Sequence, residues 1–179
     1  MAYAQKILPH YTYEDWLQWK GKWELIDGVA ISMSPLPVPK HQWVASSIRA
    51  VLYNSLKKAS CKKCLVYDPL DYKISDDTIL APDILLVCGD IKKKYLDFTP
   101  SLVVEILSPS TALRDRHIKF EIYRSQGVKY YLIVDTDKET IEIYALIDGE
   151  YQLQPFTPEF SFILDEGCEI TPDFSEVWE

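Results

Sequence analysis

The chain has 179 residues, of which 47% are hydrophobic and 26% charged, with a formal net charge of −8. This length and apolar content suit one globular domain over residues 1–179, and the aromatic content of 13% argues against an intrinsically disordered chain. No apolar run reaches the roughly 18 residues of a membrane span, the first residues lack the apolar core of a signal peptide, and the acidic balance argues against a surface that coats nucleic acid. We therefore expect a soluble, cytoplasmic protein.

The first part of the chain predicts a helix, a hairpin and a longer helix. Thr12 is a candidate N-cap ahead of two acidic residues in "TYEDWLQWK", so a short helix is expected over 12–20. The stretch "KWELIDGVAISMS" predicts two strands joined by a turn at Asp27-Gly28. After a proline-rich loop, apolar residues at three- and four-residue spacing predict an amphipathic helix over 41–59.

The middle of the chain predicts three strand segments. Residues 64–74 read as a strand interrupted at Asp68-Pro69, and residues 76–88 as a strand or strand pair interrupted at Ala81-Pro82-Asp83. The third segment, "SLVVEIL" (101–107), is apolar enough to be buried on both faces.

The last part predicts a helix between two strands and then a hairpin. "SPSTALRDRHIKFEIYRSQG" indicates a loop and a helix that ends at Gly127, and "VKYYLIVDT" follows as a strand. Two strands joined through a helix are expected to be parallel. A hairpin with its turn at Asp148-Gly149 comes next. Together the elements predict an α/β fold: a mixed central β-sheet flanked by helices, with additional hairpins.

The four cysteines give no zinc signature. Cys61 and Cys64 form one C-x-x-C pair, while Cys88 and Cys168 stand apart and the three histidines are scattered. A structural zinc site needs a second close pair of Cys or His. We interpret the four as free thiols of a reducing cytosol, with a surface disulfide or an adventitious metal as the alternatives.

Three charged residues occupy positions that packing alone would not favour. Asp83 follows Pro82 at the start of an apolar strand, Glu105 lies inside "LVVEIL", and Lys119 is on the next helix. If neighbouring strands bring the two carboxylates together, their oxygens suit Mg²⁺, and the lysine could orient or deprotonate a water or stabilise phosphate charge. The alternative for Asp83 is that its side chain only stabilises a turn, and the alternative for Glu105 is a buried ion pair. For Lys119 the alternative is an exposed ion pair with Asp115, four residues earlier.

These residues resemble the PD-(D/E)XK, restriction-endonuclease-like superfamily. The strings "WELIDGVAISMSP", "APDILLV", "LVVEILSPST" and "RDRHIKFEIYRSQGVKYYLIVD" resemble more narrowly the restriction endonucleases of the Uma-two type, over about residues 13–156. The resemblance implies a restriction-endonuclease-like domain that hydrolyses DNA phosphodiester bonds with a Mg²⁺ or Mn²⁺ ion. It also implies a homodimer.

The resemblance assigns roles to individual residues. Asp83 and Glu105 would be metal ligands, and Lys119 and Glu24 would complete the catalytic set. Leu107 stands where the superfamily has its lysine, so we expect the lysine role to have moved to Lys119. The alternative for Glu24 is an outward position on a hairpin strand. Ancillary candidates are His41, Gln42 and Asp115.

A second interpretation is a non-catalytic member of the same fold that binds nucleic acid or protein. The two interpretations differ in geometry. The catalytic one requires Glu24, Asp83, Glu105 and Lys119 to converge within about 4–6 Å of one point, the range of direct and water-mediated ion contacts.

Overall fold

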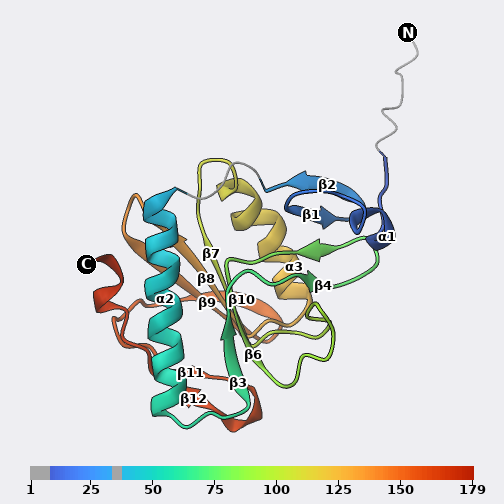
Figure 1. Ribbon diagram of the computed structural model, residues 1–179. Coiled ribbons are helices and arrows are strands. Elements are labelled where there is room, and N and C mark those ends of the chain that lie inside the picture. The colour runs from blue at the N-terminus through green and yellow to red at the C-terminus, as the bar shows by residue number, and fades with distance from the viewer. Residues whose placement is uncertain (1–8, 34–37) are drawn as a thin grey trace.

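The computed structural model describes residues 9–33 and 38–179. Two sheets organise the fold (Figure 1): a six-stranded sheet in the order β10-β9-β8-β7-β6-β3 and a four-stranded sheet in the order β2-β1-β5-β4. In the larger sheet β7 and β8 are parallel and the other pairs are antiparallel, so the predicted mixed sheet is confirmed.

The strands of the six-stranded sheet are β3 (Cys64–Tyr67), β6 (Ile84–Cys88), β7 (Leu102–Ile106), β8 (Tyr130–Asp135), β9 (Thr140–Ile147) and β10 (Glu150–Gln154). The four-stranded sheet contains β1 (Trp23–Ile26), β2 (Val29–Ser32), β4 (Tyr72–Lys73) and β5 (Ile79–Leu80). A separate small hairpin pairs β11 (Phe162–Ile163) with β12 (Glu169–Ile170). The helices are α1 (Tyr13–Trp16), α2 (Pro39–Lys58), the π-helix η1 (Arg114–Lys119), α3 (Phe120–Ser125), and the 3₁₀ helices η2 (Asp165–Gly167) and η3 (Ser175–Trp178).

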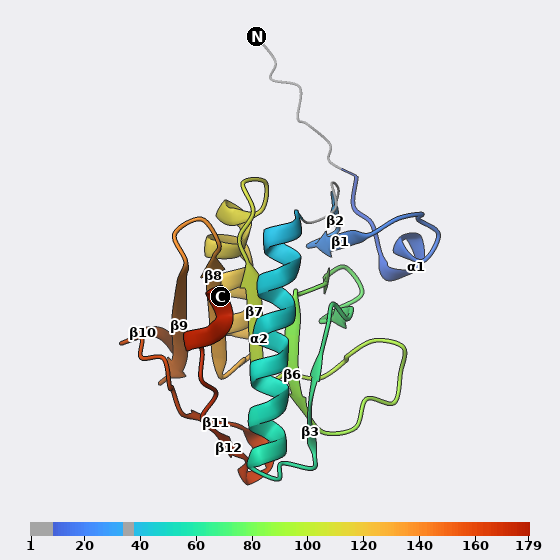
Figure 2. The same cartoon turned by 60° about the vertical axis from the view of Figure 1, so that its left-hand side comes forward.

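The two faces of the six-stranded sheet are covered by different elements (Figure 2). Helix α2 packs Ile48 and Leu52 into the core on one face, where Val104 of β7 is also buried. Because successive strand residues point to opposite faces, Val103 contributes to the core on the other face, which also contains Tyr123 of α3. Glu105 has the same parity as Val103 and therefore points toward α3.

The predicted hairpin turns are confirmed by their backbone geometry. Asp27 and Gly28 have φ values of 47° and 75°, and Asp148 and Gly149 have φ values of 51° and 81°. Two successive residues with positive φ make the type I′ turn, whose twist matches that of the flanking strands.

The interruption at Ala81-Pro82-Asp83 is the point where the chain changes sheet. Strand β5 belongs to the four-stranded sheet and β6 to the six-stranded sheet, and these three residues form the whole connection. Proline suits this position because it has no N–H to donate to either sheet. The sequence correctly located the break, and the structure adds that it joins two sheets.

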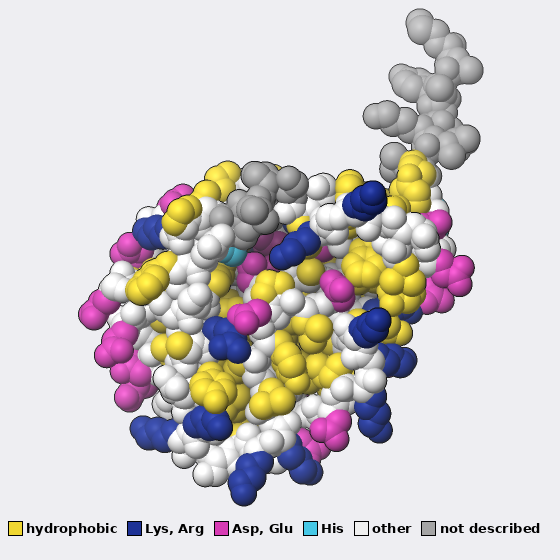
Figure 3. Space-filling view, in the orientation of Figure 1, with side chains coloured by type: hydrophobic (Ala, Val, Ile, Leu, Met, Phe, Trp, Pro, Cys, Tyr) yellow, Lys and Arg dark blue, Asp and Glu magenta, His cyan; other side chains and the backbone are white. Residues whose placement is uncertain are grey.

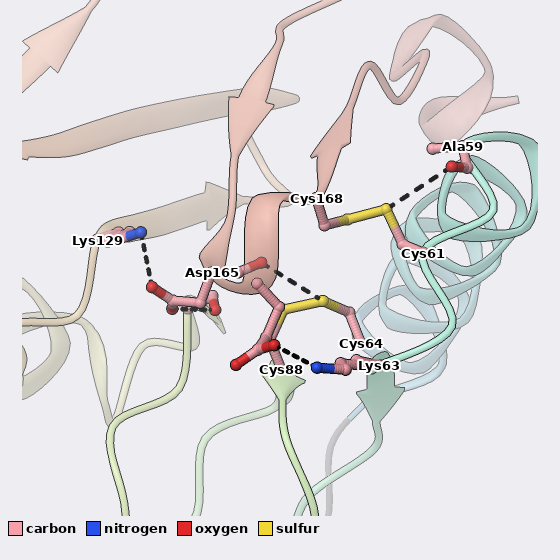
Figure 4. Close-up of a disulfide and its surroundings, with 10 residues drawn as sticks. Ala59, Cys61, Lys63, Cys64, Cys88, Lys129, Asp165 and Cys168 are labelled. Atoms are coloured by element: carbon pink, nitrogen blue, oxygen red, sulfur yellow. Dashed lines mark hydrogen bonds and ion pairs between the residues drawn. A yellow bond between two sulfur atoms is a disulfide. The ribbon is translucent and has the colours of Figure 1, made fainter.

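The interpretation of the cysteines as free thiols is wrong. Cys61 is bonded to Cys168, and Cys64 is bonded to Cys88 (Figure 4). The first disulfide spans 107 residues and attaches the start of β12 to the chain just after α2, and the second joins β3 to β6 at directly opposite positions. The sequence could not show these pairs because only the fold brings the partners together.

Within the described ranges, 9–33 and 38–179, no helix is both long and apolar enough to cross a membrane.

The disulfide assignment predicts the result of thiol labelling. Alkylation of the unfolded, unreduced protein should add no label, whereas reduction first should allow four. The Cys168→Ser variant should lose about 3–5 kcal/mol of unfolding free energy, because it opens a 107-residue loop in the unfolded chain. Mass spectrometry and urea denaturation measure these effects, and labelling of unreduced protein would contradict the pairing.

Candidate active site

A single buried ammonium group lies at the centre of the charged cluster. The Nζ atom of Lys119 is 2.7 Å from Oε1 of Glu24, 2.8 Å from Oε1 of Glu105 and 3.5 Å from Oδ1 of Asp115. All four side chains are at most 4% exposed. One cation therefore connects β1 of the smaller sheet, β7 of the larger sheet and the helix between β7 and β8.

The backbone around this lysine is a π-helix rather than the ordinary helix that the sequence predicts. Residues 114–119 form η1, which places both Asp115 and Lys119 in the interior. The hydroxyl of Tyr131 donates a 2.9 Å hydrogen bond to the Asp115 carbonyl. The wider π turn changes which side chains face inward, and such segments are frequent at functional sites.

Glu105 is held by two donors on the same oxygen. Lys119 and the Tyr123 hydroxyl donate to Oε1 at 2.8 and 2.7 Å. Burial raises the pKa of Glu105 well above its ordinary value, the Lys119 charge lowers it, and the charges of nearby carboxylates, Asp115 first, raise it further. The net direction is upward, and burial is its largest cause.

Glu24 connects its hairpin to the link between the two sheets. Its Oε1 accepts a 3.0 Å hydrogen bond from the Ala81 N–H, in addition to the contact with Lys119. Its Oε2 lies 3.4 Å from an Nη atom of Arg114. Glu24 is fully buried, so the alternative of an outward hairpin residue is wrong.

Asp83 is placed directly across from Glu105. Strands β6 and β7 are antiparallel with Ile84 opposite Val104, and continuing this register sets Asp83 opposite Glu105. Asp83 Oδ2 accepts a 2.8 Å hydrogen bond from the Ile106 N–H, so its carboxylate caps the end of β7.

His41 borders Asp83 where the cluster opens to solvent. Its Nε2 is 3.4 Å from Asp83 Oδ2 and 3.0 Å from the Ile106 carbonyl. Burial lowers the pKa of His41, but the hydrogen bond and charge of Asp83 more than offset this, so the pKa is raised overall. The Asp83 side chain is 20% exposed. Figure 3 shows Asp or Glu side chains and a His side chain in a hollow beside the N-terminal end of α2.

Several buried polar atoms of the cluster form no hydrogen bond among the described residues, although two of the oxygens lie within ion-pair distance of Lys119 or Arg114. These buried atoms are both carboxylate oxygens of Asp115, Oε2 of Glu24 and Nε of Arg114. Burial raises the pKa of Asp115, although the charge of Lys119 lowers it. Unsatisfied buried atoms are uncommon in native structures, and a group of them indicates a place for water or an ion.

The cluster suits a divalent cation by its chemistry but not by a preformed geometry. Its carboxylates outnumber its two permanent cations, Lys119 and Arg114, and hard oxygen ligands are those that Mg²⁺ takes. Within the part of the chain that the structure describes, however, no three His, Cys, Asp or Glu side chains are arranged to hold a metal ion. The glutamates instead direct an oxygen toward Lys119.

The structure therefore brings most of the predicted residues together. Asp83 and His41 join the lysine-centred group through Ile106, which lies next to Glu105. Gln42, in contrast, is exposed on α2. Sequence reasoning did not include Tyr123 among the candidate site residues, although its hydroxyl contacts Glu105. Its spacing of four residues from Lys119 was the available signal, since such residues share a helix face.

Comparison with known proteins finds a solved structure of similar overall fold. A solved structure from Anabaena variabilis ATCC 29413, described as "a putative nuclease belonging to DUF820", superposes with a TM-score of 0.73 at 19% identity, over 93% of this chain and 97% of that one. The chain therefore has the same overall fold as that structure.

The family is also shown. The model of the Uma2 family, "Putative restriction endonuclease", matches residues 11–174, and the chain belongs to this family. A relative from Synechocystis sp. (strain ATCC 27184 / PCC 6803 / Kazusa), "Uncharacterized protein slr1290", is 29% identical over 146 residues, 76% of this chain and 74% of the relative. Families of this type usually use a divalent metal ion.

Replacing Lys119 by Met should destabilise the protein by about 3–5 kcal/mol at pH 8, because it leaves buried carboxylates without their cation. The loss should shrink toward pH 5. Without the lysine, the pKa of Glu105 and Asp115 rises further above the unfolded values, so the folded variant binds protons that its unfolded chain does not. Urea denaturation across this pH range measures the effect. Lys119→Arg is the charge-conserving control, and a loss in Lys119→Met that does not change with pH would contradict the account.

Tyr123→Phe and Tyr131→Phe form a matched pair. Each removes one hydroxyl from a fully buried ring, but only Tyr123 donates to a carboxylate. We expect Tyr123→Phe to cost about 1.5–3 kcal/mol and Tyr131→Phe about 1 kcal/mol, as for charged and neutral acceptors. Equal losses of unfolding free energy in urea denaturation at pH 8 would show that the hydrogen bond to Glu105 contributes no more to stability than the bond to a neutral carbonyl.

Proposed function

We propose that this protein is a divalent-metal-dependent endonuclease that hydrolyses DNA phosphodiester bonds. The observation that best supports this is the placement of Asp83 opposite Glu105 across β6 and β7, with the Lys119 ammonium on Glu105, in a member of a restriction-endonuclease family. Glu24 joins the same lysine from the other sheet.

Asp83 and Glu105 are the residues that would hold Mg²⁺ or Mn²⁺. Such an ion supplies an activated water and stabilises charge on the leaving oxygen. The aspartate lies on the solvent side of the cluster and the glutamate on its inner side. Glu105 accepts both of its hydrogen bonds on Oε1, so neither bond engages its Oε2.

Lys119 acts as a hydrogen-bond donor and a fixed positive charge, and not as a general base. Burial alone lowers a lysine pKa, but Glu105, Glu24 and Asp115 outweigh it and raise the pKa of Lys119 far above its ordinary value. The ammonium keeps its proton at neutral pH. Of the roles open to it, orienting a water or stabilising phosphate charge is favoured over deprotonation.

The position of Lys119 accounts for the missing superfamily lysine. Leu107 follows Glu105 by two residues and packs against the apolar core on the α3 side. A lysine there is not needed for contact with the glutamate, because Lys119 reaches Oε1 from the following helix.

The proposal includes a homodimer and a cytoplasmic location. Two copies would supply two sites for the two strands of a duplex, and the cytoplasm gives access to intracellular DNA. Disulfides are uncommon in that compartment, so the two cysteine pairs would have to resist reduction there.

One observation favours the second candidate, a non-catalytic member of the fold. Lys119 already forms ion pairs with both Glu24 and Glu105, and no three potential ligands of the described chain surround a common metal position. A protein that keeps the cluster only for stability would show this arrangement.

Plasmid cleavage separates the two candidates. With Mg²⁺ or Mn²⁺ the wild type should nick or linearise supercoiled DNA, and Asp83→Asn and Glu105→Gln should lower the rate at least about a hundredfold. Asp68→Asn is the matched control, since Asp68 is 67% exposed and pairs with Arg49 at the surface. Folded Asp83→Asn and Glu105→Gln proteins that cut as fast as the wild type would exclude this active site.

A further inference from the structure

A short segment between α1 and β1 alternates aromatic and basic residues outside the carboxylate cluster. It reads Trp19-Lys20-Gly21-Lys22-Trp23. Gly21 has a φ of 90°, a conformation that favours glycine, and the chain turns there so that both tryptophans lie together. Their ring centroids are 5.5 Å apart.

The aromatic rings line a cavity. Tyr11 packs edge-on to Trp19 with centroids 5.1 Å apart, and the cavity has a volume of about 420 Å³. Its lining residues are Pro9, Tyr11, Trp19, Trp23, Val29 and Ala30. The Trp23 indole N–H donates to the Lys20 carbonyl at 2.8 Å, so this polar atom is already satisfied. The cavity therefore offers ring and methyl surface to a ligand.

The basic residues of the segment remain available to an anion. Lys20 and Lys22 are exposed, and neither forms a salt bridge within the described residues. The charge of Lys22 also acts on Asp71, where it partly offsets the rise that burial causes in the pKa of that carboxyl group. Two exposed cations beside an aromatic cavity favour a ligand that combines a flat ring with a phosphate.

Strand β1 connects this cavity to the candidate active site. Trp23 and Glu24 are consecutive in β1, and successive strand side chains point to opposite faces. Glu24 faces Lys119, while Trp23 faces the cavity. Figure 3 shows hydrophobic side chains at the surface near α1 and β1, with Lys or Arg and Asp or Glu side chains around them.

We propose that this cavity binds an unpaired nucleobase, with Lys20 and Lys22 on the flanking phosphates. The assignment rests on the proposed function, in that it names a form of its DNA substrate. Aromatic side chains bind unstacked bases of any sequence through their ring faces, while bases stacked within a duplex are not accessible to them. The substrate is therefore DNA with a single-stranded segment or end.

Binding of short labelled oligonucleotides tests the proposal, by fluorescence anisotropy in EDTA. We expect Trp19→Leu to weaken binding of a single strand roughly five- to a hundredfold and to leave a blunt duplex of the same sequence unaffected. Val29→Glu, at an exposed position of the cavity lining, should act in the same direction without touching the core. Ile147→Glu is its matched control, because Ile147 is an exposed apolar residue at the other hairpin turn.

The lysines are tested by salt dependence. Lys20→Gln combined with Lys22→Gln should reduce the slope of log affinity against log salt by about 1.4, or 0.7 for each phosphate contact. Lys57→Gln combined with Lys58→Gln makes the same charge change at the end of α2 and should leave the slope unchanged.

Two results would overturn the proposal. One is that folded Trp19→Leu and Val29→Glu proteins bind the single strand as tightly as the wild type, which would assign the cavity to another occupant such as an apolar peptide. The other is that the wild type binds the blunt duplex as well as the single strand. Binding is measured without metal, so weaker binding by Trp19→Leu supports the base site even if the plasmid is not cut. If the plasmid is cut but Trp19→Leu binds as tightly as the wild type, only the base site is rejected and the proposed nuclease activity stands.

Discussion

The buried ammonium of Lys119 is the interaction on which the rest of the site depends. It is shared by carboxylates from two different sheets and from its own helix. A carboxylate in the interior is costly unless a cation and hydrogen bonds compensate for lost water. Glu105 can therefore lie within an apolar strand only because the helix after it presents a lysine to the same face, and Glu24 fixes the β1–β2 hairpin to the sheet by the same contact.

This arrangement divides the cluster into a closed side and an open side. On the closed side, Lys119 and Tyr123 both donate hydrogen bonds to Oε1 of Glu105, so these two contacts fix the position of that oxygen. On the open side, the side chains of Asp83 and His41 are 20% and 10% exposed. Charge added from solvent, as a metal ion or as phosphate, meets Asp83 first. The ammonium of Lys119 stabilises the buried carboxylates before any ligand binds. The carboxylate of Asp83, which is partly exposed, is the one that a ligand can contact from solvent.

The sequence predicted the local elements well because their signals are local. Asp-Gly turns between alternating strands specified both hairpins, and the apolar spacing of α2 specified its buried face. The sequence raised the proximity of Asp83 and Glu105 only as a condition on strand pairing, and the register that sets them opposite each other comes from the structure. What the sequence could not show depends on long-range packing: the division into two sheets, the π turn that places Asp115 and Lys119 inward, and the pairing of Cys61 with Cys168 across 107 residues. Tyr123 belongs with these cases, because its hydroxyl acquires a partner only when α3 packs on β7.

The link between the two sheets contacts one fully buried residue of the site and contains one that is partly exposed. The two differ in how far a substitution would disturb the fold. Ala81 donates its N–H to Glu24, and two residues later Asp83 accepts the N–H of Ile106. Both ends of the Ala81-Pro82-Asp83 connection are thus fixed by carboxylates of the site. Glu24 is fully buried and supports the connection and the lysine together, so its replacement changes the fold and the site at once. Asp83 is partly exposed and bonds a strand end, so its substitution disturbs the buried network less than that of Glu24. The glutamate that first stood out within an apolar strand has a lysine and a tyrosine as its partners, and a metal ion would be an addition to that pair rather than the reason that the carboxylate is tolerated.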